Sequence, residues 1–442
     1  MVQTQENSGP PAEEALCEAF FNRTLSFWKW TVLGAPLWWV LGLNLIIYQG
    51  MALFLFIRLI SFYQRQDRGI YLPSSCVIIF FLMLVYLFSI LIHAQSFPVG
   101  RVMAAVYNLS YWMMGCFVIV VFANTFSMLQ TRFFLKTFDS LAWIMGFLWI
   151  LAFFAAMYGQ HSVIFPTPLD GLSRYFENAD LLSQTLKVQL LIEDWFASVF
   201  RLRFNVFSPY PTATGGLLMI TLMMITTLAA MRGKLKSPLF ITLFALNFSA
   251  LLMTLSRMSV MVFLLSIAIA FLLGKKRAFL WIVFLSCVIV LAGPRILEAT
   301  DVIWKLRQNS SETRFALYYY SLQQLQGIDW ILGLGIKDRG NVFMYPIGSH
   351  STYVSLCVKT GILGLAAFVL FQVSLVLRWF RLRQWVSEDR ESFFFWRGLG
   401  WVFIAMMIWT MTEDLDAPQL VTFLYFSLVG IFEGMRRELL TR

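Results

Sequence analysis

The sequence has few charged residues, and this scarcity sets its class. Only 13% of the 442 residues are charged and 59% are hydrophobic. Repeated apolar runs approach the ~20 residues that span a bilayer core. This composition excludes a soluble protein of several domains, and we expect an all-α polytopic membrane protein. Residues 1–26 would form a cytoplasmic tail, and residues 27–442 a single transmembrane domain.

Cysteine and histidine are also scarce, and neither residue type is grouped. No set of histidine, cysteine and carboxylate residues has the spacing of a metal site, and no cysteine pair suggests a disulfide framework. We therefore expect metal-independent chemistry without a cofactor. Met1 to Cys17 is polar and acidic, without the basic-then-apolar pattern of a cleavable signal peptide. The cysteines are expected to be packing residues: Cys17, Cys76, Cys116, Cys287 and Cys357.

The apolar runs predict about twelve transmembrane helices. The glycine and asparagine at positions 42 and 44 would separate the first two spans, and counting these two as one would place the amino terminus outside. The predicted spans are 27–43, 45–60, 73–92, 102–125, 137–158, 211–230, 237–256, 258–273, 278–293, 351–377, 398–412 and 418–434.

The net charge of +10 is distributed as expected for a membrane protein and not for a nucleic-acid-binding protein. Every second loop carries a basic cluster, which is the positive-inside pattern. With twelve spans, all these clusters and both termini are cytoplasmic, and two long segments, 160–210 and 294–350, lie on the outer face. The basic clusters are Arg65/Arg68, Arg132/Lys136, Arg232/Lys234/Lys236, Lys275/Lys276/Arg277, Arg378/Arg381/Arg383 and Arg436/Arg437.

The first outer segment contains an apolar stripe at helical spacing beside Glu193 and Asp194. We interpret it as a helix that lies on the membrane surface or covers the spans as a lid. The stripe consists of Val188, Leu191, Trp195, Val199 and Leu202.

The second outer segment has the spacing of a helix start at Asn309-Ser310-Ser311-Glu312, a capping box. Arg314 would lie about one turn inside this helix, where an arginine can bind phosphate together with free backbone N–H groups. The alternative is an arginine paired with Glu312 or Asp301. Tyr318-Tyr319-Tyr320 follows and suits stacking on sugar faces, although interfacial aromatics are common without a ligand.

Arg257 and His350 are two further candidates near the outer face. Arg257 lies where one span ends and the next begins, and a charge there is costly unless it is paired or faces water. The alternative is an arginine that reaches to the interface. A neutral imidazole at His350 could accept a proton from a sugar hydroxyl, or simply bond to a backbone carbonyl. His93 and His161, also near the outer face, lack a comparable polar context.

The short outer turn between the last two spans carries the only dense acidic patch on that side, Glu413, Asp414 and Asp416. Three interpretations stay open. The carboxylates orient an acceptor, pair with the arginines, or belong to a solvated turn.

Several of these residues together resemble a known family. His350-Ser351, nine residues, and Gly361-x2-Gly364 are similar to the histidine motif of the O-antigen ligase and polymerase superfamily. Leu255-Ser256-Arg257 resembles the family's Ser-Arg at a span end. Arg314 followed by Leu332-Gly333-Leu334-Gly335 extends the likeness, which covers roughly 211–375.

The resemblance implies a GT-C glycosyltransferase of the bacterial inner membrane with its active site on the periplasmic face. It would transfer a glycan from undecaprenyl diphosphate to an acceptor sugar with inversion. Arg257 and Arg314 would bind the diphosphate in place of a metal ion, and His350 would activate or orient the acceptor hydroxyl. The family often has an arginine before a Gly-x-Phe…Pro-Asn run. The stretch 201–211 lacks that glycine and Pro-Asn, so Arg203 is a further diphosphate contact by position only.

Three functions remain in competition. A ligase would transfer a finished polysaccharide to lipid A–core, and this is the first expectation. A polymerase would join lipid-linked repeat units of O-antigen or an exopolysaccharide. A transporter or flippase is the third, but its ionisable sites are expected near the bilayer midplane with internal repeats, and neither pattern is seen.

Overall fold

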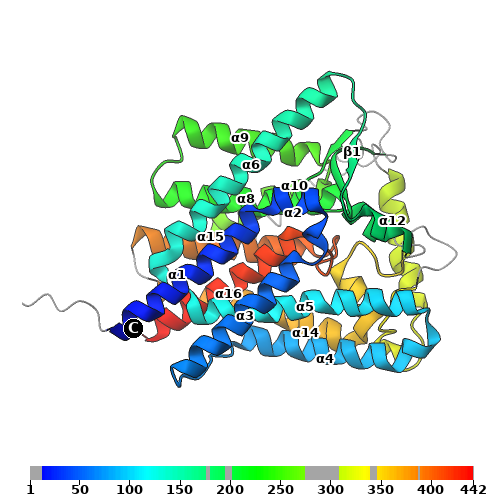
Figure 1. Cartoon of the computed structure of the whole chain (residues 1–442), viewed down its shortest axis with the longest axis horizontal. Coiled ribbons are helices and arrows are strands. Elements are labelled where there is room, and N and C mark those ends of the chain that lie inside the picture. The colour runs from blue at the N-terminus through cyan, green and yellow to red at the C-terminus, as the bar shows by residue number, and fades with distance from the viewer. Residues whose placement is uncertain are drawn as a thin grey trace, which may run out of the picture.

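The computed structural model describes residues 12–175, 180–194, 202–273, 308–338, 346–386 and 389–441. Long helices pack side by side, and a small sheet lies at one end of them (Figure 1). The helices are α1 (Ala12–Leu33), α2 (Ala35–Leu41), α3 (Ile47–Arg65), α4 (Ser74–His93), α5 (Val99–Thr125), α6 (Thr131–Met157), α7 (Asp180–Thr185), α8 (Pro211–Met231), α9 (Pro238–Met253), α10 (Arg257–Leu273), α12 (Gln308–Gln323), α13 (Asp329–Leu332), α14 (Thr352–Leu382), α15 (Arg390–Trp409) and α16 (Leu420–Thr441).

Seven helices in the described part of the chain are long and apolar enough to cross a membrane. They are α3, α4, α5, α6, α8, α14 and α15, and α9 and α10 are shorter apolar helices. The prediction of a polytopic, mostly helical membrane protein is therefore confirmed. The count of about twelve stays a prediction, because the span 278–293 lies outside the described residues, together with 294–307 and 339–345 of the loop after it.

Predicted spans coincide with helices over most of the described chain. For example, 73–92 corresponds to α4 and 211–230 to α8. The largest boundary difference is at the start, where α1 already begins at Ala12, within the predicted tail 1–26. The expected break at Gly42 is observed. This glycine ends α2 with a left-handed backbone (φ +77°), a conformation that glycine adopts without a steric penalty.

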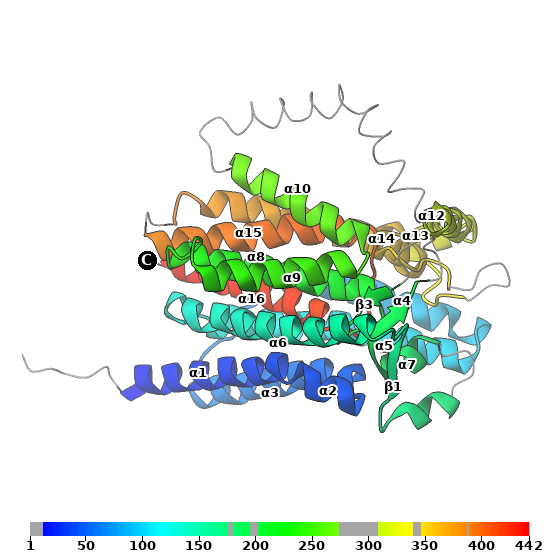
Figure 2. The same ribbon diagram turned by 90° about the horizontal axis from the view of Figure 1, so that it is seen from above.

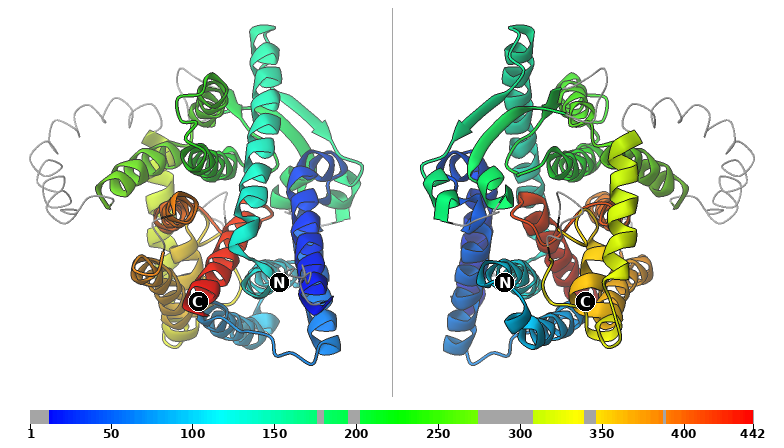
Figure 3. Two further views of the ribbon diagram at one scale, coloured as in Figure 1. Left: turned by 90° about the vertical axis from the view of Figure 1, so that its left-hand side faces the viewer. Right: turned by 90° about the vertical axis from the view of Figure 1, so that its right-hand side faces the viewer.

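The two ends of the bundle differ in character. The described ends of the chain, in α1 and α16, lie at the same end, together with the last turn of α3 and the turn between α8 and α9 (Figure 1; Figure 3, left). We call this the basic end. The opposite end carries α12, the sheet and the turn between α15 and α16, and we call it the polar end. The position of both described ends of the chain on one side agrees with the predicted topology.

The outer segment 160–210 is not the helix that we expected. It forms a three-stranded antiparallel sheet in the order β1-β2-β3, with β1 (Val163–Pro166), β2 (Lys187–Glu193) and β3 (Leu202–Phe204). Val188 and Leu191 lie on β2, whose β-branched residues favour an extended chain. Trp195 and Val199 lie outside the described residues. The fold is mostly helical, in agreement with the predicted class, and it carries one small sheet that the sequence did not predict.

Helix α8 forms the centre of the bundle and is buried along nearly its whole length. Two adjacent glycines allow this close packing. Gly215 faces Ser256, just before α10, and Ser259 in the first turn of α10, and Gly216 faces the indole of Trp409 at the end of α15. A Cβ at either position would lie within 3.0 Å of these atoms. Small residues let membrane helices approach closely, and here they bring the ends of α10 and α15 together.

Helix α14 is broken at Gly361, whose backbone is non-helical (φ +61°, ψ −161°). The turn Gly333-Leu334-Gly335 fits into the break. The N–H of Leu334 donates to the carbonyl of Val358 (2.7 Å), and that of Gly335 to the carbonyl of Lys359 (3.0 Å). Broken backbone inside a membrane protein needs such partners, because no water is available there. The two glycine motifs of the sequence are therefore parts of one structure.

Candidate functional site

The loop before α14 holds His350 in an unusual backbone conformation. His350 has φ +66°, in the left-handed region that few non-glycine residues adopt. Its backbone is fixed from both sides. The hydroxyl of Tyr318 on α12 donates to the His350 carbonyl (2.5 Å), and the His350 N–H donates to Oδ2 of Asp414 (3.2 Å). Such strain is maintained by the surrounding contacts and is common at functional sites.

The turn between α15 and α16 is not a solvated acidic turn. Glu413 and Asp416 are 7% and 5% exposed. The hydroxyl of Thr352, the first residue of α14, donates to the Glu413 carbonyl (2.6 Å) and accepts from the Leu415 N–H (2.9 Å). We call residues 413–416 the acidic turn. It is held directly against the loop that contains His350, so its carboxylates are part of the site.

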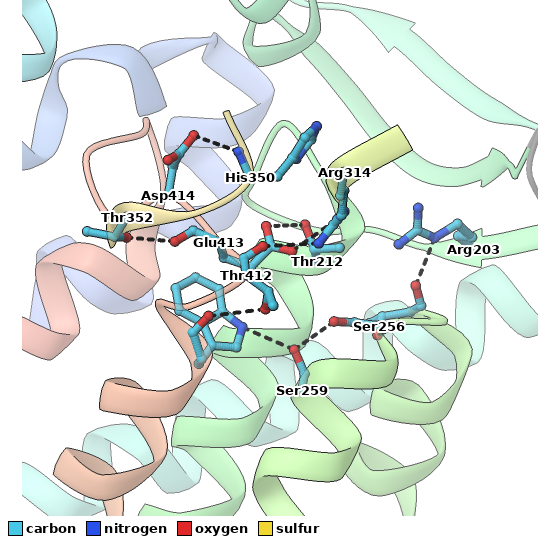
Figure 4. Close-up of polar contacts among 12 residues, drawn as sticks. Arg203, Thr212, Ser256, Ser259, Arg314, His350, Thr352, Thr412, Glu413 and Asp414 are labelled. Atoms are coloured by element: carbon cyan, nitrogen blue, oxygen red, sulfur yellow. Dashed lines mark hydrogen bonds and ion pairs between the residues drawn. The ribbon is translucent and has the colours of Figure 1, made fainter. Parts of the chain in front are cut away.

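Arg314 on α12 points into this turn (Figure 4). Its Nη1 donates to the carbonyl of Thr412 (3.1 Å), and its Nη2 lies 3.4 Å from Oε1 of Glu413. Oε2 of Glu413 accepts from the hydroxyl of Thr212 on α8 (2.8 Å). Of the interpretations left open by the sequence, pairing of the acidic residues with an arginine is the one observed for Glu413.

Helix α12 extends through Arg314 and Tyr318 as predicted, but the expected capping box is not seen. Gln308 already belongs to the described helix, so Asn309 lies within it and is not its N-cap. The contacts that the structure shows for Arg314 are with Thr412 and Glu413.

Arg203 and Arg257 approach the same end of the bundle from another side. Strand β3 places Arg203 so that its Nε donates to the carbonyl of Thr254 (2.9 Å). Thr254 and Ser256 form the turn between α9 and α10, and Arg257 is the first residue of α10. The hydroxyl of Ser256 lies 2.8 Å from that of Ser259, which accepts from Trp409 Nε1 (3.2 Å; Figure 4). The turn beside Arg257 is thus tied to both Arg203 and α15.

Burial and charge change the protonation behaviour of the site. Burial, followed by the positive charges of Arg314 and Lys337, lowers the pKa of His350 to about 3. The imidazole is therefore neutral at physiological pH, as expected, but it is a weaker base than we expected. Burial raises the pKa of Glu413, and the charges of Arg314 and Arg203 act in the opposite direction. Burial likewise raises the pKa of Tyr318.

Two lysines complete the charge pattern, and sequence reasoning missed both. Lys337 Nζ lies 3.2 Å from Asp414 Oδ2, the atom that also accepts from the His350 N–H. Lys359 on α14 is fully buried, and its Nζ lies 2.5 Å from Asp416 Oδ2. A lysine within an apolar span is a strong signal in a membrane protein, so Lys359 could have been found from the sequence.

The other two histidines are separate from the site. His93 at the end of α4 lies between the Ser89 carbonyl and the carboxylate of Asp329, 3.2 Å from its Oδ1. It ties α4 to α13. His161 is exposed. No group of three histidine, cysteine or carboxylate residues within the described ranges could hold a metal ion, and metal independence stays a prediction.

A comparison with known families adds to this geometry. Residues 242–369 match the family model described as O-Antigen ligase. The matched range includes Arg257, Arg314 and His350, but Arg203 and the acidic turn lie outside it. No curated protein matches the chain. With several apolar helices of spanning length, the chain is a multi-pass membrane protein. The match confirms the predicted resemblance: over residues 242–369 the chain is similar to the O-antigen ligase and polymerase superfamily.

Proposed function

We propose that the protein is an O-antigen ligase-like glycosyltransferase of the bacterial inner membrane. It moves a glycan from undecaprenyl diphosphate to an acceptor sugar, such as that of lipid A–core, at the periplasmic face. The observation that carries the proposal is the joining of Arg314, His350 and the acidic turn at the polar end of the bundle. The family match supports a lipid-linked glycan as donor.

The arginines bind the donor in this proposal. Arg314 and the N-terminal residue of α10, Arg257, bind the diphosphate, with Arg203 as a further contact. Arginine forms paired hydrogen bonds with phosphate oxygens. As the bond between the sugar and the diphosphate breaks, negative charge grows on the leaving oxygen, and fixed positive charges stabilise it. Glu413 keeps Arg314 in place before the donor binds.

His350 binds the acceptor hydroxyl and accepts its proton in this proposal. Its neutral imidazole accepts a hydrogen bond from the acceptor hydroxyl, whose oxygen attacks the anomeric carbon while the diphosphate leaves. The proton passes to the imidazole. A bound diphosphate offsets the positive charges of Arg314 and Lys337, which lower the pKa of His350 in the free protein. The donor therefore raises the basicity of His350 when a base is needed.

The size of the carrier-linked glycan in cells with His350→Gln tests this function. His161→Gln is the matched control, because His161 is exposed and lies just before β1, outside the acidic turn and the loop that holds His350. Long polymer on the carrier, with none on lipid A–core, supports the ligase. Single repeat units on the carrier or acceptor instead support the polymerase, which shares the same site chemistry. Unchanged glycan and carrier pools would contradict both.

A transporter or flippase is a weaker alternative that two features of the structure favour. The buried Lys359–Asp416 pair and the broken helix α14 are features that transporters also use. A flippase variant without function would leave carrier-linked glycan on the cytoplasmic side of the membrane. A transferase variant would accumulate it on the periplasmic side.

A further inference from the structure

Two arginines near the basic end of the bundle, Arg23 on α1 and Arg58 on α3, lie far from the candidate site. Helices α1 and α3 run side by side (Figure 2). Arg58 lies close enough to Arg23 for the two positive charges to repel each other. The Arg58 guanidinium also lies over three aromatic rings, at 5.3 Å from Phe20, 4.8 Å from Phe27 and 5.7 Å from Phe54. We call Arg23 and Arg58 the basic pair, and the aromatic rings of α1 and α3 line it.

The charge of this pair is not balanced within the described residues. Nη1 of Arg58 is buried and has no hydrogen-bond partner there. None of the described carboxylates forms an ion pair with Arg23 or Arg58. Other arginines near the same end do have such partners. Arg132 pairs with Glu391, and Arg378 pairs with Glu433. A buried N–H of a charged group without an acceptor is costly, so a ligand with negative charge is expected.

The surface around the pair is apolar and faces outward. Phe27 and Phe54 are 37% and 43% exposed, and Trp30 on α1 is 71% exposed. Arg58 precedes Arg65, in the last turn of α3, by about 10 Å along the helix axis. In the predicted topology, this depth corresponds to the boundary between acyl chains and headgroups in the cytoplasmic leaflet. Tryptophan and arginine are typical of that boundary.

We propose that Arg23 and Arg58 bind one anionic phosphate group, supplied by a glycerophospholipid of the cytoplasmic leaflet. The phosphodiester oxygens accept hydrogen bonds from both guanidinium groups, including Nη1 of Arg58, and remove the repulsion between them. The acyl chains lie along Phe27 and Phe54. A lipid with net negative charge is preferred, because a cationic headgroup would approach two arginines.

Lipid retention in nanodiscs tests this site. The full-length protein is placed in phosphatidylcholine discs that contain phosphatidylglycerol, and the retained phosphatidylglycerol is counted by native mass spectrometry. The Arg23→Gln/Arg58→Gln variant should retain at least about fivefold less phosphatidylglycerol than the wild type. The Arg65→Gln/Lys136→Gln control removes the same charge from exposed positions near the same end and should retain wild-type levels. Equal retention in the wild type and both variants would overturn the proposal.

Further measurements separate the source of the phosphate and the effect on folding. Arg23 is exposed, so Arg23→Gln alone should fold normally and still lose retention. Retention at the wild-type level in this variant would overturn the role of Arg23. In discs of phosphatidylcholine alone, inorganic phosphate should give no rise in the melting temperature. A rise that Arg23→Gln removes would support the phosphate site but assign it to a soluble ligand.

Discussion

Nη2 of Arg314 lies 3.4 Å from Oε1 of Glu413, although 99 positions separate the two residues in the sequence. The other carboxylate oxygen accepts from Thr212. Three distant parts of the chain, α8, α12 and the acidic turn, therefore meet at one carboxylate. This contact fixes the arginine that would bind the donor beside the loop that holds His350.

Replacement of Arg314 should reduce transfer more than it reduces folding. Arg314→Lys keeps the charge but loses the paired hydrogen-bond geometry, and Arg314→Gln loses both. We expect kcat to fall about 100-fold or more in Arg314→Gln, as when one transition-state donor is removed. Steady-state kinetics with a carrier-linked glycan measure this. Lys236→Gln, an exposed change in the turn between α8 and α9, should leave kcat unchanged.

The Arg314–Glu413 pair should also control the pH dependence of stability. Burial raises the pKa of Glu413 and the Arg314 charge lowers it. In Arg314→Gln the pKa therefore rises further. Glu413 in the native state then binds a proton more tightly than Glu413 in the unfolded state does. The protonated carboxyl therefore stabilises the native state at low pH, and this stabilisation is lost as pH rises through the native pKa. The melting temperature of Arg314→Gln, relative to wild type, should fall from pH 5 to pH 8. A second change, Glu413→Gln, should abolish this slope, and a slope that persists would contradict the assignment.

His350 should remain neutral in acid. With its pKa lowered to about 3, native His350 stays unprotonated at pH values at which histidine in the unfolded chain is protonated. Its burial therefore costs stability as pH falls below the usual histidine pKa. The chain has only three histidines, so nitrogen NMR of labelled imidazoles can resolve them, with His350→Gln for assignment. Lys337→Met should raise the pKa of His350. An imidazole that titrates near its usual pKa in the wild type would refute this.

The buried Lys359–Asp416 pair should behave as a unit. Lys359→Met leaves Asp416 buried without its counter-charge, which we expect to cost about 3–5 kcal/mol in stability. Asp416→Asn likewise leaves Lys359 buried without its counter-charge. The double variant should recover most of this loss, because Asn still accepts from Trp112 Nε1, now 3.1 Å from Asp416 Oδ2. Unfolding measurements on all four proteins test the coupling, and additive losses would show that the pair does not act together.

Gly361 should tolerate no side chain. Its φ is +61°, and a Cβ there would lie 2.2 Å from the carbonyl oxygen of Ile331. Gly361→Ala should therefore separate the Gly333-Leu334-Gly335 turn from α14 and lower the yield of folded protein. Gly50→Ala on α3 is the control, since a Cβ there meets nothing within 4 Å and alanine favours a helix. Equal yields of the two variants would contradict the account of the break.

The sequence predicts what local patterns encode. Hydropathy predicts most helices of the described chain, and short motifs indicate that Arg257, Arg314 and His350 are candidate site residues. Neither source predicts that Glu413 holds Arg314, because no local pattern encodes a contact across 99 positions. The apolar spacing of Val188 and Leu191 predicts a helix where strand β2 forms, because these two positions also fit a helical period. Averaging over an apolar window concealed the single charge of Lys359.

The most direct test of the transferase is transfer by the purified protein in liposomes. The liposomes contain a labelled glycan on undecaprenyl diphosphate, with lipid A–core as acceptor. We predict that label appears on the acceptor as free undecaprenyl diphosphate is released in equal amount. Arg314→Gln and His350→Gln should nearly abolish both, and His161→Gln should not. Transfer at the wild-type rate by Arg314→Gln would contradict the account. So would a wild-type protein that shows no transfer and no release with either acceptor, lipid A–core or a second lipid-linked repeat unit.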